Sequence, residues 1–231
     1  MTNIRDTNVL IRQSIARAQQ EEDEHCSLKR YVKARLPNIH PSISLPAENP
    51  EATLIDFLTR YIEHVPDFLD ALSELAKEAG IYGFIEQFIH IAHNFFIQPP
   101  DAVEDHIGLQ ALIDEAYLTH RLMEEVNDRI VMACGVPLTP MDMTISNLIV
   151  HDLLGEEFAN QLDLAVLYSL ERLFDAESIL KSTELKCYAA AHHTQGWNQA
   201  LSQWPCLAGD SAIELTLSLY NTEIGNTTYL H

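Results

Sequence analysis

Apolar residues recur at helical spacing along most of the chain, and proline and glycine residues separate the helical segments. Asn49 followed by Pro50 is typical of a helix start, whereas Gly80, Gly135 and Gly155 are typical of helix ends. The predicted helices cover about 7–36, 51–79 with a kink or a break at Pro66, 81–97, 108–134, 139–154 from Thr139-Pro140, and 156–190 with a break near 182–183.

The end of the chain has a different period. Ile213, Leu215, Leu217 and Leu219 alternate with polar residues, which predicts a half-buried β-strand. Residues 221–226 are rich in turn formers, so 227–230 are predicted to pair back as a hairpin. A lone hairpin has marginal stability, and it must therefore pack on the helices or pair with another chain.

Together these elements predict a mainly α-helical protein. The expected architecture is an antiparallel multi-helix bundle, of the ferritin-like or the haem-oxygenase-like kind. The predicted organisation is an N-terminal helical arm (1–36), a proline-rich linker (37–50), the bundle (51–208) and a C-terminal β-hairpin (209–231) that packs on the bundle or on a partner chain.

The charge of the chain is strongly acidic and unevenly distributed. The 231 residues carry a formal net charge of −20, which disfavours nucleic acid as a partner. Residues 1–35 hold 7 basic and 5 acidic side chains, and the remainder holds 7 basic and 29 acidic ones. The basic-leaning arm is therefore expected to dock on the acidic body or to remain an ordinary surface helix. A homodimer through the arm or through the C-terminal strand is the partner prediction.

The compartment prediction rests on cysteine usage and apolar run length. The four cysteines form no CxxC pair, and no apolar run approaches the length of a membrane span. No signal peptide is visible at the start of the sequence. We therefore predict a cytoplasmic protein that does not cross a membrane.

No familiar catalytic or nucleotide-binding motif occurs, so candidate chemistry rests on histidine and glutamate residues in apolar helices. Glu86, His90 and His93 project from one stripe of the predicted helix 81–97. A metal ion would satisfy all three if the stripe is buried, whereas backbone partners or solvent would satisfy them otherwise. Their spacing, over residues 86–93, resembles the ligand run in the last helix of some helical di-iron oxygenases.

A second polar line lies on the predicted helix 108–134. Tyr117, His120 and Glu124 follow one another at helical spacing on its apolar side. The remaining charged residues of that helix are predicted to face water: Asp114, Glu115, Arg121, Glu125, Asp128 and Arg129. The alternative to a ligand role is a buried His120 held by Glu124. Weaker candidates are Asn147 and His151, which share a helix face, and Asp163, which lies among apolar residues.

Two functional hypotheses follow, with a third in reserve. The first is a metal-centred bundle, in which Glu86, His90, His93, His120, Glu124 and His151 bind iron, manganese or zinc and support oxidoreductase activity on a small molecule. The second is a non-catalytic interaction or regulatory protein whose buried histidines are structural. The third is a small-molecule pocket inside the bundle, where His120 and Glu124 orient a polar group of the ligand.

Overall fold

The computed structural model describes residues 4–99, 108–139, 142–171, 173, 182–195 and 213–216. This part of the chain contains eight α-helices, two short 3-10 helices and one two-stranded antiparallel sheet. The helices are α1 (Ile4–His25), α2 (Ser27–Arg35), α3 (Pro50–Glu78), α4 (Tyr82–Ile97), α5 (Leu112–Cys134), α6 (Thr144–Leu154), α7 (Glu156–Glu171) and α9 (Thr183–Gln195). The 3-10 helices are η1 (Leu36–Asn38) and η2 (Gly108–Ala111), and the strands are β1 (Ile43–Ser44) and β2 (Glu214–Leu215).

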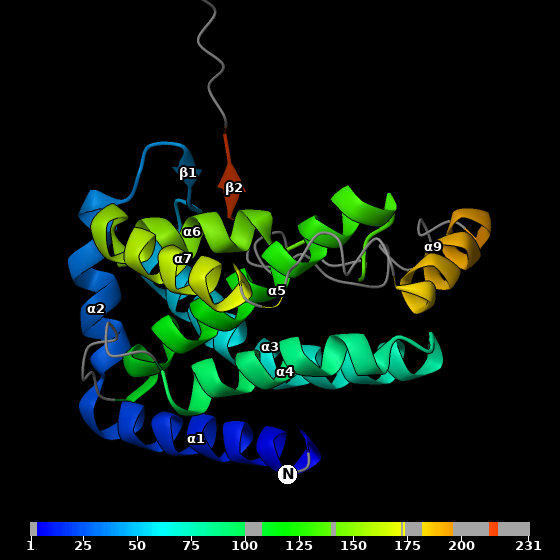
Figure 1. The fold of residues 1–231 in the computed structure, drawn as a ribbon. Helices are drawn as coiled ribbons and strands as arrows, with labels where there is room; N and C mark the ends of the chain where they lie inside the picture. The colour runs from blue at the N-terminus through cyan, green and yellow to red at the C-terminus, as the bar shows by residue number, and fades with distance from the viewer. Residues whose placement is uncertain are drawn as a thin grey trace, which may run out of the picture.

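The helices pack around α5, which passes through the middle of the molecule (Figure 1). On one side α5 contacts α3 and α4, and α1 lies across these two helices at the edge of the bundle. On the other side α5 contacts α6 and α7. The mainly α-helical prediction is therefore confirmed, with α5 shared by both halves of the packing.

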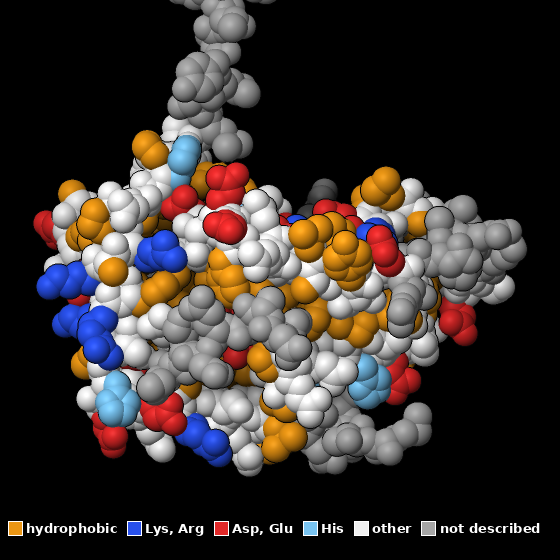
Figure 2. Space-filling view, turned by 60° about the vertical axis from the view of Figure 1, so that its left-hand side comes forward, with side chains coloured by type: hydrophobic (Ala, Val, Ile, Leu, Met, Phe, Trp, Pro, Cys, Tyr) orange, Lys and Arg blue, Asp and Glu red, His pale blue; other side chains and the backbone are white. Residues whose placement is uncertain are grey.

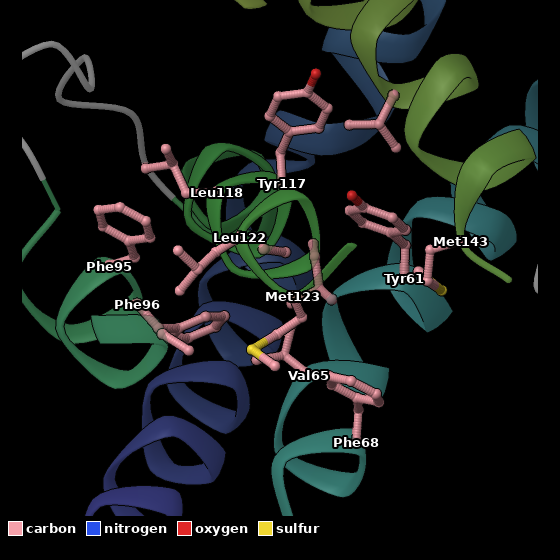
Figure 3. Close-up of a cluster of buried hydrophobic side chains, with 14 of the residues drawn as sticks. Tyr61, Val65, Phe68, Phe95, Phe96, Tyr117, Leu118, Leu122, Met123 and Met143 are labelled. Carbon is pink, nitrogen blue, oxygen red and sulfur yellow. The ribbon is translucent and has the colours of Figure 1, made fainter. Parts of the chain in front are cut away.

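One apolar core connects these helices. Aromatic side chains of α3 and α4, such as Phe57, Phe68 and Phe88, are buried in it. Figure 3 shows the part of this core where Leu118 and Leu122 of α5 lie beside the aromatic rings of α4. Five residues of α1 and α2 belong to the same core: Ile11, Ile15, Ala18, Leu28 and Val32. The N-terminal segment is thus packed on its own chain, and its burial stabilises the bundle.

The single helix predicted over 7–36 is wrong, because the chain breaks at Cys26. Cys26 adopts a left-handed conformation with φ of 51°, which ends α1 and turns the chain into α2. Glu22 stabilises this break, since its carboxylate accepts hydrogen bonds from the Ser27 hydroxyl and from the Leu28 amide. The apolar period runs through both helices, so periodicity alone did not reveal the break.

The predicted boundaries of the central helices agree well with the structure. α3 begins at Pro50 and continues through Pro66 without a break. Gly80, Gly135 and Gly155 follow α3, α5 and α6, and all three have positive φ values, as expected for residues just beyond a helix. The expected break near 182–183 coincides with the start of α9.

The predicted helix start at Thr139-Pro140 is wrong, because α6 begins at Thr144. Pro140 itself lies outside the described residues. Asp142 accepts a hydrogen bond from the amide of Thr144, so its carboxylate serves the first residue of α6 instead of a capping box that begins at Thr139.

The strand predicted near the C-terminus pairs with a partner that the sequence did not indicate. β2 lies antiparallel to β1, with Ile43 opposite Leu215 and Ser44 opposite Glu214. Thr216 extends the pairing by donating its amide hydrogen to the carbonyl of Ser42. The linker therefore supplies the second strand, while residues 227–230 of the predicted hairpin lie outside the described part of the chain.

Among the described helices, none combines the length and the apolar character that a bilayer span requires.

Candidate functional site

The first predicted cluster is divided between solvent and the core. Glu86 and His90 have side chains that are 42% and 46% exposed, and their closest approach is 3.9 Å between Oε1 and Nε2. His93, one turn further along α4, is buried. The stripe that these residues share lies at the edge between solvent and α1, because α1 covers only part of α4.

His93 connects α4 to the N-terminal helix. Its Nε2 lies 2.7 Å from Oδ1 of Asn8, and because an amide oxygen only accepts, His93 is the donor. The amide nitrogen of Asn8 donates in turn to Asp70 on α3, at 2.6 Å. Desolvation lowers the pKa of His93 to about 4, so the imidazole is neutral at physiological pH. These contacts are structural, since they join three helices.

His120 has a partner other than the one predicted. Its side chain is fully buried in α5, and its Nε2 lies 3.0 Å from the main-chain carbonyl oxygen of Tyr61. Desolvation, followed by the nearby His64, lowers the pKa of His120 to about 3. The alternative in which Glu124 holds His120 is therefore wrong, because the carboxylate of Glu124 binds other side chains.

The six predicted ligands do not meet at one point. Glu86 and His90 face solvent, His93 binds Asn8, His120 binds Tyr61, and Glu124 and His151 line a cleft on the other side of α5. Within the described part of the chain, no three His, Cys, Asp or Glu side chains are grouped so that they could hold a metal ion. The geometry therefore gives no support to an iron, manganese or zinc centre built from these residues. Helical spacing put each set of side chains on one stripe of its helix, but the α4 stripe meets solvent and α1, whereas the α5 side chains meet α3 and the cleft.

A cleft between α5, α6 and α7 gathers polar side chains from all three helices. Its volume is about 250 Å³. Tyr117 and Tyr61 direct their hydroxyl groups toward α6 and α7, whereas Leu118 and Leu122 point the opposite way, toward α4 (Figure 3). We name this hollow the α5–α6–α7 cleft, and it is lined by Tyr117, Arg121, Glu124, Thr144, Asn147, Leu148, His151 and Asp163.

Glu124 organises one end of the cleft. Its two carboxylate oxygens accept hydrogen bonds from the Thr144 hydroxyl at 3.0 Å and from the Asn147 amide at 2.7 Å. Arg121 forms a close ion pair with the same carboxylate. Asn147 also accepts the buried hydroxyl of Tyr61 at 2.7 Å. The start of α6 is thus fixed to α5 and α3 by one connected set of bonds.

Asp163 of α7 organises the other end. Its Oδ1 accepts hydrogen bonds from the Tyr117 hydroxyl and from Nε of Arg121, both at 3.0 Å. Its Oδ2 lies 3.9 Å from Nε2 of His151, which is beyond hydrogen-bond distance. Oδ1 of Asp163 therefore accepts two hydrogen bonds from the protein, while Oδ2 lies beside the imidazole of His151 in the cleft.

Arg121 holds both ends together, because its guanidinium lies between the carboxylates of Glu124 and Asp163. Burial opposes the charge on Arg121, but the two carboxylates outweigh it and raise the pKa of the guanidinium. Burial also raises the pKa of Tyr117, with Asp163 adding to the effect, so Tyr117 remains a hydrogen-bond donor. One cation and two anions give the cleft an excess of one negative charge.

The sequence indicated part of this site. Asn147 and His151 share the predicted helix face, and both line the cleft, while Asp163 has the partners that a carboxyl group among apolar residues requires. The prediction that Arg121 faces water is wrong, as it is for Asp114 and Glu115, which are buried. Arg121 was missed because its i,i+3 spacing to Glu124 is equally typical of an exposed ion pair.

Comparisons of the chain with protein-family models, with curated protein sequences and with solved structures find no match. The functional argument therefore rests on the geometry of the cleft.

Proposed function

We propose that this protein binds a small polar molecule in the α5–α6–α7 cleft, through a donor group of the ligand that reaches Asp163. The observation that supports the proposal is the convergence of side chains from three helices on one hollow, with Oδ2 of Asp163 left beside His151. Ligand sites in proteins combine such a concave surface with a few oriented polar groups.

The charge of the cleft favours a cationic ligand. Arg121 compensates only one of the two carboxylates, and the whole chain carries a net charge of −20. An ammonium or guanidinium group is therefore attracted over a distance of about one Debye length and can replace water at Asp163. Leu148, whose side chain lines the cleft and is 46% exposed as a residue, supplies an apolar wall for the carbon skeleton.

The rigidity of the cleft supports binding as well. Thr144, Asn147 and Tyr61 are held by hydrogen bonds that need no ligand. A site whose polar groups are already oriented loses little conformational entropy when a ligand enters. Binding of a small molecule, without a catalytic role for the buried histidines, is the function we assign on this basis.

Ligand-observed NMR with a library of small amines, alcohols and carboxylic acids tests the proposal. Amines are expected to bind the wild-type protein, and Asp163→Asn is expected to abolish the signal. Asp128→Asn, on the exposed side of α5, is the matched control with the same change in charge and should bind as the wild type does.

Leu148→Trp provides an independent variant, because it fills the cleft and leaves the hydrogen bonds of Asp163 in place. Amines should no longer bind to this variant. Amine binding that survives both Asp163→Asn and Leu148→Trp, or a wild-type protein to which no library member binds, would overturn the proposal.

A further inference from the structure

A second hollow adjoins the α5–α6–α7 cleft. Its volume is about 380 Å³, and it shares the side chains of Leu148 and His151 with the cleft. We name it the strand pocket, and it is lined by His40, Ser42, Ile43, Leu148, His151, Asp152, Glu156, Asn160 and Leu215. Its walls come from the linker, α6, α7 and β2, which are distant from one another in the sequence.

His151 stands between the two hollows. Its Nε2 lies 3.4 Å from Oδ1 of Asn160, which lines the strand pocket, and 3.9 Å from Oδ2 of Asp163, which lines the cleft. Asn160 and Asp163 are three residues apart on α7 and therefore present their side chains on the same face. The imidazole of His151 therefore lines both hollows and lies between them.

The strand pocket has a fixed wall. Asp152 accepts a hydrogen bond from the main-chain amide of His40 at 3.0 Å, which ties the linker to α6. The antiparallel pair β1 and β2 then places Ile43 opposite Leu215. Figure 1 shows these two strands side by side at the α6 side of the helices. The two-stranded sheet therefore closes a pocket that the helices alone leave open.

The chemistry of the strand pocket repeats that of the cleft. Two carboxylates, Asp152 and Glu156, line it, and no Lys or Arg is among the described residues that do so. Its apolar surface comes from Ile43, Leu148 and Leu215. On the face shown in Figure 2, most Lys and Arg side chains gather toward one edge of the molecule, while Asp and Glu side chains also lie elsewhere on that face.

We propose that the strand pocket is the second half of one elongated binding site, and that its ligand is a linear diamine or polyamine. One ammonium group would bind Asp163 in the cleft, the carbon chain would cross Leu148, and the second ammonium group would bind at Glu156. This inference rests on the function proposed for the cleft. The two hollows together have the size of ordinary ligand sites, about 300 to 1,000 Å³.

Calorimetric titration of the full chain with putrescine, cadaverine and spermidine tests the inference, with butylamine as the monoamine. At least one of the diamines or spermidine is expected to bind about tenfold more tightly than butylamine, because the second group binds at a high effective concentration. Glu156→Gln should weaken that binding by about two- to fivefold, which is typical of an exposed ion pair, and should leave butylamine unaffected.

Glu157→Gln is the matched control, because Glu157 is the next residue of α7, is exposed and does not line the pocket. It should bind all four compounds as the wild type does. Equal affinity for butylamine and the diamines, or identical behaviour of Glu156→Gln and Glu157→Gln, would overturn the second subsite while leaving the cleft proposal in place. Failure of every amine, butylamine included, would overturn both.

Discussion

His120 of α5 donates a hydrogen bond from Nε2 to the main-chain carbonyl oxygen of Tyr61 on α3, over 3.0 Å. An α-helical carbonyl already accepts one bond within its helix, so this second bond attaches the centre of α5 to the centre of α3. The donor role fixes the proton on Nε2. Nδ1 of His120 is buried and has no hydrogen-bond partner in the described part of the chain, which keeps the ring neutral.

This contact predicts a loss of stability in acid. The unfolded chain protonates His120 below its ordinary pKa of 6.5, whereas the folded chain keeps it neutral until about 3. The free energy of unfolding should therefore fall by about 1.4 kcal/mol per pH unit from this residue as the pH drops from 6.5 toward 4. His120→Gln retains a donor without titrating, so urea denaturation at several pH values should show a shallower decline.

His90→Gln is the control for the substitution itself, because His90 is exposed on α4 and its replacement should change stability by less than about 0.5 kcal/mol at neutral pH. A decline that is equally steep in His120→Gln and in the wild type would contradict the assignment of His120.

Glu115 predicts a pH effect of the opposite sign. Burial raises its pKa to about 8, and its Oε2 has no hydrogen-bond partner within the described residues. The unfolded chain ionises this group above 4.5, so the folded state is penalised at neutral pH and recovers as the pH falls from 8 to 4.5. Glu115→Gln should stabilise the protein by about 3 kcal/mol at pH ~7, and the gain should shrink to nearly nothing at pH ~4.5.

Thermal and urea denaturation at both pH values measure this gain. Glu157→Gln, an exposed substitution of the same kind on α7, should change stability by less than about 0.5 kcal/mol at either pH. A Glu115→Gln variant that is no more stable than the wild type at neutral pH would show that Glu115 is ionised in the folded protein.

Asn8 is predicted to be the main polar anchor of the N-terminal helix. It is 2% exposed and connects His93 with Asp70. Asn8→Leu should cost about 1 to 3 kcal/mol, because it leaves the buried His93 without its partner, whereas the half-exposed Asp70 keeps its ion pair with Arg12. Gln19→Ala removes an exposed hydrogen bond to Glu63 and should cost less than about 1 kcal/mol.

Amide hydrogen exchange distinguishes this anchor from a general effect on the fold. In Asn8→Leu, the amide exchange rates of α1 are expected to rise more, relative to the wild type, than those of α5. Equal costs for the two substitutions, or faster exchange spread over the whole bundle, would show that α1 is held by its apolar side chains alone.

Tyr61→Phe tests the hydrogen-bond chain that leads from the core to the cleft. The substitution leaves the amide oxygen of Asn147, a buried residue, without the hydroxyl donor at 2.7 Å. A cost of about 1 to 3 kcal/mol in urea denaturation is expected. Tyr168→Phe is the control, since Tyr168 is 66% exposed on α7 and should cost almost nothing. A neutral Tyr61→Phe would mean that water replaces the hydroxyl.

The sequence predicted local features well and contacts between helices poorly. Gly80, Gly135 and Gly155 were recognised as helix ends because a positive φ is a local requirement. The break at Cys26 was missed, since it depends on a carboxylate placed earlier, in Glu22, and not on a glycine or proline. Helical spacing predicts on which face of the helix His120 and Glu124 lie. It does not predict which other helix packs against that face, because this depends on the tertiary structure.

The candidate site also shows that contacts between helices are hard to predict from the sequence. His151 and Asn147 were placed on one face by their spacing, and both line the cleft. The sequence predicts that Arg121 faces solvent, because it does not show that Asp163, 42 residues later, returns to meet it. The pairing of β1 with β2 was hidden for the same reason, since two residues of a linker carry almost no strand pattern.

The proposed binding of a cationic small molecule at Asp163 in the α5–α6–α7 cleft can be followed residue by residue. Mapping of backbone amide chemical shifts during a titration with putrescine tests it most directly. Saturable shifts are expected at the residues around Arg121, His151 and Asp163, and they should be lost in Asp163→Asn but not in Asp128→Asn. Shifts that are absent, or that are spread over the acidic surface without saturation, would contradict it.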